Sequence, residues 1–370
     1  MESPTSRRVT VSFALLAGIL VIAGFMAVQF PPRPAAPAAP ATAVLPSPVA
    51  ADYGPPPAGV PLLWVHDPNH PGWLIGFDWT GKPRGTVKLS QQVGQYDKLN
   101  QAPDGSAFGY EPNGKGGFHL FFDQLGNPIG SAGSSVRYQS EMWADDSRHL
   151  CSLDGSGGHW SLGFALPGEA PNPVNEIALD PSSLARSGII AYSVAACSAR
   201  NDRAVIPYSY PGRPTAYSVV RISDGAILQQ RTYAAGQVEN VTASVDGSLI
   251  AENSGVTTLI RRASDLTLVS GLDATLRVLA FSGDDSSVLV STAPLGAGLP
   301  ANQEVLDLQT GRVIWRGEGT SAVSSFAAQP GGNAFAVALT TDGNPPGTIL
   351  MIYGDGSRPA KLPGLFTPIW

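Results

Sequence analysis

The stretch LNQAPDGSAFGY, residues 99–110, contains two apolar strands joined by a turn centred on Asp104 and Gly105. Asp bonds neighbouring backbone amides and Gly accepts a positive φ, so this pair favours a tight turn between antiparallel strands. Later segments repeat the pattern and keep Asp or Gly at the turn. They are EMWADDSRHLCSL (141–153), ACSARNDRAVIPY (196–208), VTASVDGSLIAE (241–252), LAFSGDDSSVLVS (279–291) and FAAQPGGNAFAVAL (326–339).

A second strand–turn–strand unit alternates with the first and occurs seven times, at a spacing of about 46 residues. This spacing matches the roughly 40–50 residues of a four-stranded propeller blade. The copies are LIGFDWTGKPRGTV (74–87), LFFDQLGNPIGSA (120–132), SLGFALPGEAPNPV (161–174), SVVRISDGAILQQ (218–230), TLIRRASDLTLVS (258–270), EVLDLQTGRVIWR (304–316) and LMIYGDGSRPAKL (350–362). The two units together predict the four strands of one blade, and hence an all-β propeller.

The first blade is one strand short, because no Asp-turn unit precedes residues 74–87. The apolar C-terminal segment GLFTPIW, residues 364–370, follows the last hairpin with nothing after it. We expect this segment to complete the first blade and close a ring of seven, which removes the open edges of a broken ring. Unit spacings vary, so six or eight blades are the alternatives. The longest interval, residues 166–223, contains an insertion expected to cap one face.

The segment LNQAPDGSAFGYEP resembles the PD-type WD40-like repeat of TolB-like periplasmic propellers, with the close match at Pro103, Asp104 and Gly105. The other copies keep Asp or Gly and lose Pro, and the Gly-His and Trp-Asp pairs of true WD40 repeats are missing. The resemblance covers residues 61–370 as a repeat pattern. It implies the fold, a central channel and a role in partner binding, and it carries over no functional residue.

The N-terminus predicts the compartment of the protein. Arg7 and Arg8 precede an uncharged apolar run at residues 9–30, which as a helix would rise about 33 Å, enough to span a bilayer. The run is longer than a secretory h-region, and positive charge before it keeps residues 1–8 cytoplasmic. We therefore expect an uncleaved single-pass signal anchor in the cell membrane. Cleavage near Ala41 and Ala43, or a twin-arginine signal at Arg7 and Arg8, is the alternative.

Residues 31–60 are rich in Pro and Ala, a composition that favours an extended, semi-rigid spacer. The expected organisation is therefore a cytoplasmic end (1–8), a transmembrane segment (9–30), a linker (31–60) and an extracytoplasmic propeller (61–370). Charged residues are only 14% of the 370 residues and the formal net charge is −6. An acidic chain of this kind lacks the basic stripe of nucleic-acid binders, so we expect no nucleic-acid partner.

The chain has two cysteines, Cys151 and Cys197, on predicted strands of adjacent blades. In an exported domain such a pair is compatible with a disulfide, and two buried free thiols are the alternative.

No pattern in the sequence predicts a catalytic residue, a metal ligand or a cofactor. The Gly-x-Ser-x-Gly, P-loop, Rossmann and EF-hand patterns are missing, and prolines around His66 and His70 exclude the helix that a His-x3-His metal pair needs. Polar residues on predicted innermost strands are the candidate ligand-binding groups at the channel mouth, with solvated strand ends as the simpler interpretation. They are Asp97, Glu141, Glu239 and Arg277.

The missing catalytic pattern and the complete repeat together favour a binding or scaffold module whose partner is another envelope or extracellular protein. A hydrolase or lactonase-like enzyme with its site at the channel mouth and a carbohydrate-binding propeller are the alternatives. The fold class does not choose among them, since propellers support both binding and catalysis.

Overall fold

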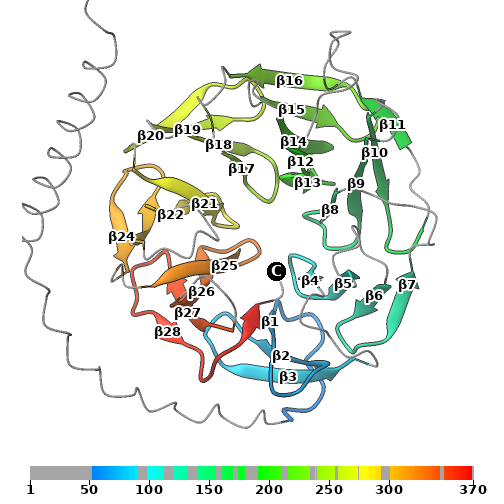
Figure 1. The fold of residues 1–370 in the computed structure, drawn as a ribbon, viewed down its shortest axis with the longest axis vertical. Helices are drawn as coiled ribbons and strands as arrows, with labels where there is room; N and C mark the ends of the chain where they lie inside the picture. The colour runs from blue at the N-terminus through cyan, green and yellow to red at the C-terminus, as the bar shows by residue number, and fades with distance from the viewer. Residues whose placement is uncertain are drawn as a thin grey trace, which may run out of the picture. The chain divides into compact units, whose positions relative to one another are not determined.

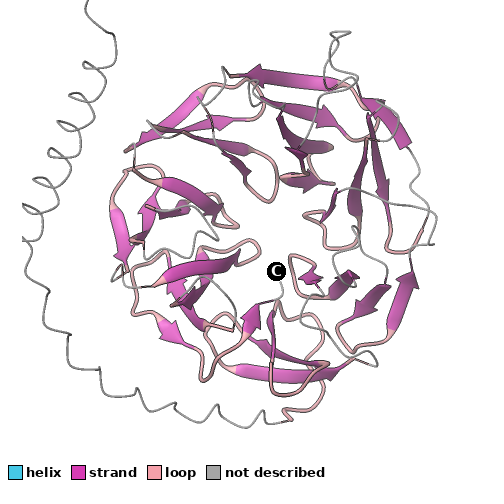
Figure 2. Cartoon of the chain, viewed as in Figure 1, coloured by secondary structure: helices cyan, strands magenta, loops and turns pink. Residues whose placement is uncertain are grey.

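The computed structural model describes most of the chain after residue 51. The described residues are 52–89, 98–111, 120–131, 140–155, 160–169, 174–177, 179, 191–209, 216–233, 238, 240–254, 257–273, 275–292, 301–317, 319, 321–341 and 346–368. Their regular elements are all β-strands (Figure 2). No helix among them is long and apolar enough to span a bilayer. The segment expected to cross the membrane, residues 9–30, lies outside the described residues.

The strands form seven antiparallel sheets arranged as blades around a central axis (Figure 1). Each blade is given from its innermost to its outermost strand. Blade 1 is β29 (Thr367–Pro368), β1 (Leu63–His66), β2 (Trp73–Phe77) and β3 (Pro83–Lys88); blade 2 is β4 (Lys98–Gln101), β5 (Ala107–Glu111), β6 (Leu120–Asp123) and β7 (Pro128–Ser131). Blade 3 is β8 (Ser140–Trp143), β9 (Leu150–Asp154), β10 (Trp160–Ala165) and β11 (Val174–Ile177); blade 4 is β12 (Ala191–Tyr192) with β13 (Ala196–Ser198), β14 (Arg203–Ser209), β15 (Ala216–Arg221) and β16 (Ile227–Thr232). Blade 5 is β17 (Asn240–Ala243), β18 (Leu249–Asn253), β19 (Thr258–Arg262) and β20 (Leu268–Leu272); blade 6 is β21 (Arg277–Phe281), β22 (Ser287–Ser291), β23 (Gln303–Asp307) and β24 (Val313–Arg316). Blade 7 is β25 (Ala322–Ala328), β26 (Ala334–Thr340), β27 (Thr348–Tyr353) and β28 (Ala360–Lys361).

The C-terminal strand closes the ring, as the sequence predicted. β29 pairs antiparallel with β1 through Val65 with Pro368 and His66 with Thr367. Phe366 sits just before this strand and its ring lies 5.7 Å from that of Phe77 in blade 1. The first blade therefore combines the two ends of the propeller, and the count of seven is confirmed over six or eight.

The Asp-containing turns between the first and second strands of the blades share one geometry. Asp104 accepts a hydrogen bond from the backbone of Ser106 at 2.8 Å, and Asp246 and Asp284 bond the residue two positions on in the same way. The next residue of this turn has a positive φ in six blades, although Asn201 and Pro330 take the place of the Asp in blades 4 and 7. These residues are Gly105, Ser147, Asp202, Gly247, Asp285 and Gly331. These turns lie on one face of the ring, called the turn face below, together with the turns between third and fourth strands.

The hydrophobic core is divided among the interfaces between blades. Seven clusters of buried side chains occur in the described chain, each combining residues of two neighbouring blades. Trp64 of blade 1, for example, is fully buried, meets Phe108 of blade 2 edge to face at 5.3 Å and donates to Gly105 O at 2.9 Å. Because both faces of each sheet are covered, the inner strands are apolar on both sides.

A disulfide joins two neighbouring blades. Cys151 on β9 and Cys197 on β13 are bonded with their Cα atoms 5.9 Å apart, and both side chains are fully buried. The chain-entropy model assigns about 4 kcal/mol to a bond that closes a loop of this length, with a sequence separation of 46.

Two segments differ from the simplest interpretation of the sequence. Residues 174–177, expected within a capping insertion, form β11, which pairs with β10 as the outermost strand of blade 3. The end of the Pro-rich segment lies against the outer edge of blade 1, where Thr86 donates to Gly54 O at 2.8 Å and Lys88 forms an ion pair with Asp52 at 2.5 Å. This contact covers the exposed edge of β3, an arrangement that prevents edge-to-edge pairing.

Candidate functional site

Two of the four polar residues expected at the channel mouth, Glu141 and Arg277, lie within the described part of the chain. Glu141 lies on β8, the innermost strand of blade 3, and Arg277 begins β21, the innermost strand of blade 6. Arg277 lines a cavity of about 710 Å³ at the centre of the ring, and Met142, the neighbour of Glu141, lines it as well. Asp97 and Glu239 lie outside the described residues.

The wall of this central cavity is built mainly from small and apolar side chains of the innermost strands. Two of its polar side chains already serve the contact between blades 5 and 6. Asn253 accepts from the backbone N–H of Val278 at 2.8 Å and donates to Val278 O at 3.2 Å, and Thr242 also donates to that oxygen at 3.2 Å. Asn253 and Thr242 therefore have a structural role, because their side chains hydrogen-bond the neighbouring blade.

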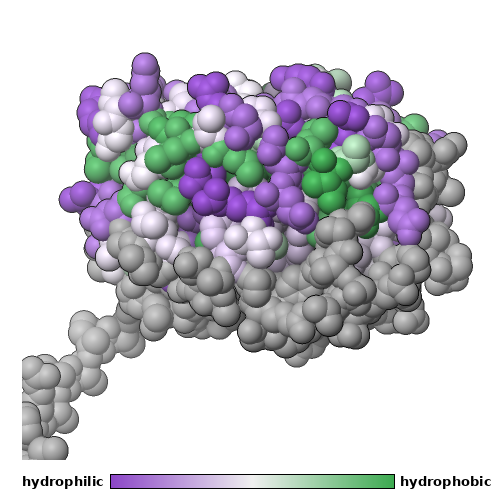
Figure 3. Space-filling view, turned by 90° about the horizontal axis from the view of Figure 1, so that it is seen from above, coloured by the Kyte–Doolittle hydropathy of each residue, from purple (hydrophilic) through white to green (hydrophobic). Residues whose placement is uncertain are grey.

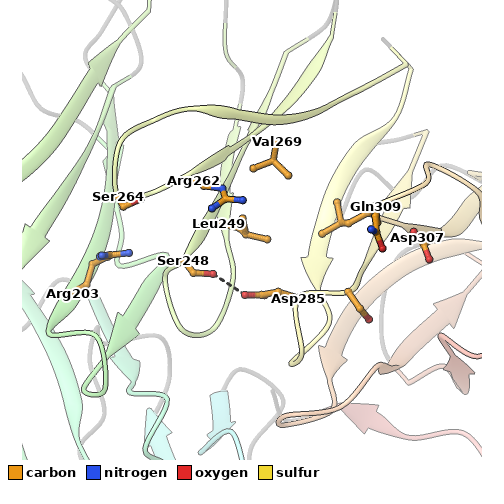
Figure 4. Close-up of a pocket in the computed structure, with 11 residues that line it drawn as sticks. Arg203, Ser248, Leu249, Arg262, Ser264, Val269, Asp285, Asp307 and Gln309 are labelled. Carbon is orange, nitrogen blue, oxygen red and sulfur yellow. Dashed lines mark hydrogen bonds between the residues drawn. The ribbon is translucent and has the colours of Figure 1, made fainter.

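A second hollow, the blade 5/6 groove, lies on the turn face and has a volume of about 610 Å³ (Figure 4). It is lined by Arg203, Ser248, Leu249, Arg262, Ser264, Val269, Asp285, Ser286, Asp307, Leu308 and Gln309. Leu249, Val269 and Leu308 supply apolar surface. Figure 4 shows Arg203 and Arg262 on the side of blades 4 and 5, and Asp307 and Gln309 across from them on blade 6. The groove therefore separates positive from negative charge across an apolar strip.

The charge of the Arg side is open to a ligand. Arg203 Nη1 donates to Gly247 O at 3.3 Å, while its buried Nε has no acceptor among the described residues. Arg262 is an exposed side chain at the end of β19. Both arginines line the groove, and guanidinium groups form charge-assisted hydrogen bonds with anionic groups.

The two carboxylates on the acidic side of the groove, Asp285 and Asp307, have pKa values shifted in opposite directions. Burial raises the pKa of Asp285 to about 6, and the nearby carboxylates of Asp246 and Asp284 act in the same direction. A hydrogen bond from Ser248 Oγ at 2.7 Å opposes this rise in pKa (Figure 4). The pKa of Asp307 is lowered, chiefly by the hydrogen bond that its carboxylate accepts from the backbone of Thr310.

Backbone strain is concentrated around the groove. Four non-glycine residues in the described chain have positive φ, and three of them adjoin or line it: Asp285 (56°), Leu266 (58°) and Asp202 (49°), which precedes Arg203. Glycine fills the position of Leu266 in most other blades, as at Gly311 and Gly356. Left-handed conformations are costly for residues with a Cβ and gather at functional sites, so this distribution supports the groove as a site.

Exposed apolar side chains extend from the groove onto the rim of the ring. Leu268 and Val269 on β20 are 57% and 40% exposed, and Val313 on β24 is 39% exposed. The rim seen in Figure 3 accordingly carries apolar patches among polar side chains.

Two of the three histidines in the described chain pair with a carboxylate, while His66 Nε2 is buried without a hydrogen-bond partner among the described residues. His70 Nδ1 lies 2.6 Å from Asp67 Oδ2 and its ring lies 4.9 Å from that of Trp73, while His149 Nδ1 lies 2.5 Å from Asp146 Oδ2. Burial lowers the pKa of His66. Within the described ranges, no three His, Cys, Asp or Glu side chains gather as ligands for a metal ion.

No local pattern in the sequence marks Arg203, Arg262 or Asp307, because they come from three blades and are far apart in the chain. One available signal was the loss of glycine at turn positions where other repeats keep it, as at Asp285 and Leu266.

No family model matches the sequence, and the search of curated proteins finds no match. Among solved structures, the β-propeller domain of Cps50 (Swd1) from Myceliophteria thermophila superposes with a TM-score of 0.51 at 14% identity, covering 76% of this chain and 91% of that one. A eukaryotic initiation factor superposes with a TM-score of 0.44 at 12% identity, covering 85% of this chain and 92% of the other. At this identity the first likeness concerns the fold alone. Together with the seven closed sheets, it identifies the fold of the described residues as a seven-bladed β-propeller.

Proposed function

We propose that this protein is a membrane-anchored, extracytoplasmic propeller that binds another envelope or extracellular protein and acts as a binding module or scaffold. The observation that carries the binding role is the blade 5/6 groove, where charged side chains of both signs, apolar surface and left-handed turn residues coincide. The anchor rests on the apolar run at residues 9–30 behind Arg7 and Arg8, with residues 31–51 as the spacer. The Pro103-Asp104-Gly105 turn supports placing the repeat with the PD-type, TolB-like propellers.

The binding role can be tested by site-specific photo-crosslinking in cells that express the full chain. A photoreactive amino acid would replace Val269 at the groove, and in a matched chain Lys361 on the outer strand of blade 7, which is also exposed. We expect a discrete protein adduct from position 269 and none from position 361. Identical adducts from both positions, or none from either, would contradict the proposal.

The location is tested separately with the full chain carrying a C-terminal tag. Alkaline carbonate extraction should leave the protein in the membrane pellet, and protease added outside the cytoplasmic membrane should remove the tag. Release into the soluble fraction, or a protected tag, would show that the anchor or its orientation is wrong.

A further inference from the structure

Building on the proposed binding role, we propose that the blade 5/6 groove holds an extended peptide segment of the partner in which an apolar residue lies between an acidic and a basic residue. The order of charges follows from the groove itself. Arg203 and Arg262 lie on one side, Asp285 and Asp307 on the other, and the apolar strip runs between them (Figure 4).

The apolar strip is the part of the groove that gains most from being covered. Val269 is 40% exposed, and Leu249 and Leu308 are half-buried. Removing apolar surface from water is favourable by roughly 25 cal/mol per Å², so an apolar side chain of the partner would be stabilised here. Leu268 and Val313 are also exposed, on the outermost strands of the two blades that form the groove.

The positive side favours a carboxylate. The Arg203 guanidinium has a buried Nε without a described acceptor, and Arg262 is exposed nearby. Guanidinium groups bind carboxylates through charge-assisted hydrogen bonds that are stronger than neutral ones. An acidic residue of the segment would therefore pair with the exposed guanidinium of Arg262, beside Arg203.

The negative side favours a basic residue. The turn that begins at Asp307 holds its carboxylate in place, because the backbone N–H and the hydroxyl of Thr310 both donate to Oδ1, at 2.8 and 2.9 Å. Asp285 also lines the groove, and its carboxylate accepts a hydrogen bond from Ser248 Oγ. Since the two signs are separated, a uniformly charged polymer or membrane surface would meet repulsion on one side.

The test selects peptides on the full chain in detergent micelles, from a random library of displayed twelve-residue peptides. We expect enrichment of sequences with an apolar residue flanked by an acidic residue on one side and a basic residue on the other. The best peptide is then synthesised together with a version in which the two charges are exchanged.

A double variant, Arg262→Glu with Gln309→Lys, places a negative charge on the arginine side and a positive charge on the acidic side, both at exposed positions. The selected peptide should lose at least tenfold in affinity for this variant, and the charge-exchanged peptide should gain at least tenfold. Arg358→Glu, at the exposed hairpin turn of blade 7, is the control and should leave both affinities unchanged. Equal melting temperatures of the variants and the parent chain establish that the fold is intact.

The proposal is overturned if no peptide with paired charges is enriched, or if the double variant binds both peptides as the parent chain does. The crosslinking experiment separates this failure from failure of the binding role. If the adduct from position 269 also forms in the double variant, the charge assignment is wrong while the binding role stands.

Discussion

At the scale of single residues, the repeated turn shows that residues with different side chains adopt the same left-handed backbone conformation. The position with positive φ is glycine in blades 2, 5 and 7, whereas blades 3, 4 and 6 have Ser147, Asp202 and Asp285. The polar replacements form hydrogen bonds that a glycine could not. Ser147 accepts from Asp104 N of blade 2 at 3.0 Å, and Asp285 accepts from Ser248 of blade 5. Strain in the turn is thus offset by contact between blades.

Where glycine occupies this position, two different effects can favour it, and a matched pair of substitutions distinguishes them. A Cβ on Gly105 would lie 2.4 Å from Leu62 O, whereas a Cβ on Gly331 would meet nothing within 4 Å. Gly331→Ala should therefore cost only the left-handed strain, about 1 kcal/mol. Gly105→Ala adds a backbone clash, and we expect about 3 kcal/mol in total. Urea denaturation of the two variants measures both losses, and equal losses would contradict the clash.

The raised pKa of Asp285 predicts how stability depends on pH. The folded carboxyl, with a pKa of about 6 against an ordinary value of 3.8, binds its proton more tightly than the unfolded one. Its contribution to stability is therefore complete below about pH 4 and is lost as the pH rises through about 6. Asp285→Asn, which is neutral and tolerates the left-handed turn, should be more stable than the parent at pH 7 by on the order of 1 kcal/mol.

The measurement is the difference in unfolding free energy between Asp285→Asn and the parent at several pH values from 4 to 7. The carboxylates of Asp246 and Asp284 interact with Asp285, so the pH dependence of this difference reports Asp285 together with its repulsion from these two neighbours. A difference that does not change with pH would contradict the assignment.

At the scale of elements, contacts between blades include buried charge as well as apolar packing. Glu252 on β18 is 2% exposed and lies 3.0 Å from Arg261 Nε through each carboxylate oxygen. Tyr217 on β15 donates to it at 2.8 Å, and Arg231 on β16 lies 3.3 Å away. Side chains from two strands of blade 4 therefore contact one buried carboxylate of blade 5. These contacts specify how the two blades are aligned.

Removing the buried charge should be costly because it leaves the arginines without their counterion. We expect Glu252→Gln to lower the free energy of unfolding by about 3 kcal/mol. Glu304→Gln is the control, since Glu304 pairs at 2.7 Å with Arg316, whose side chain is 64% exposed. Its loss should stay below about 1 kcal/mol. Thermal or urea melts of both variants give the comparison, and similar losses would show that burial of the Glu252 cluster adds nothing.

At the scale of the whole molecule, stability depends on closing the ring. The C-terminal strand pairs with β1, and Phe366 adds a backbone bridge to Gly347 and ring contact with Phe77. Without it blade 1 would expose the inner edge of β1 and the apolar cluster that it shares with blade 7.

Deleting residues 364–370 should therefore leave little soluble, cooperatively folded protein. Leu365→Ser is the control, because this side chain is 45% exposed and its replacement keeps the closing strand. Soluble yield and the sharpness of the thermal transition measure the effect. A truncated chain that melts as cooperatively as the parent would contradict closure as the source of stability.

The sequence by itself determined the repeat, the blade count and the closing strand. These features depend on local alternation of apolar strands with Asp and Gly turns, and each copy repeats the information. The sequence did not predict residues 174–177 as the outermost strand β11, because the Pro and Asn residues around them suggested an irregular insertion.

Only the tertiary structure decided which residues meet. The groove draws Arg203, Arg262 and Asp307 from three blades, and the Glu252 cluster joins strands of two, so no local pattern marks either set. The depth of Asp285, and hence its raised pKa, likewise depends on the packing of neighbouring turns. Strand and turn preferences act over a few residues, whereas desolvation and charge pairing depend on distances in space that the ring closure sets.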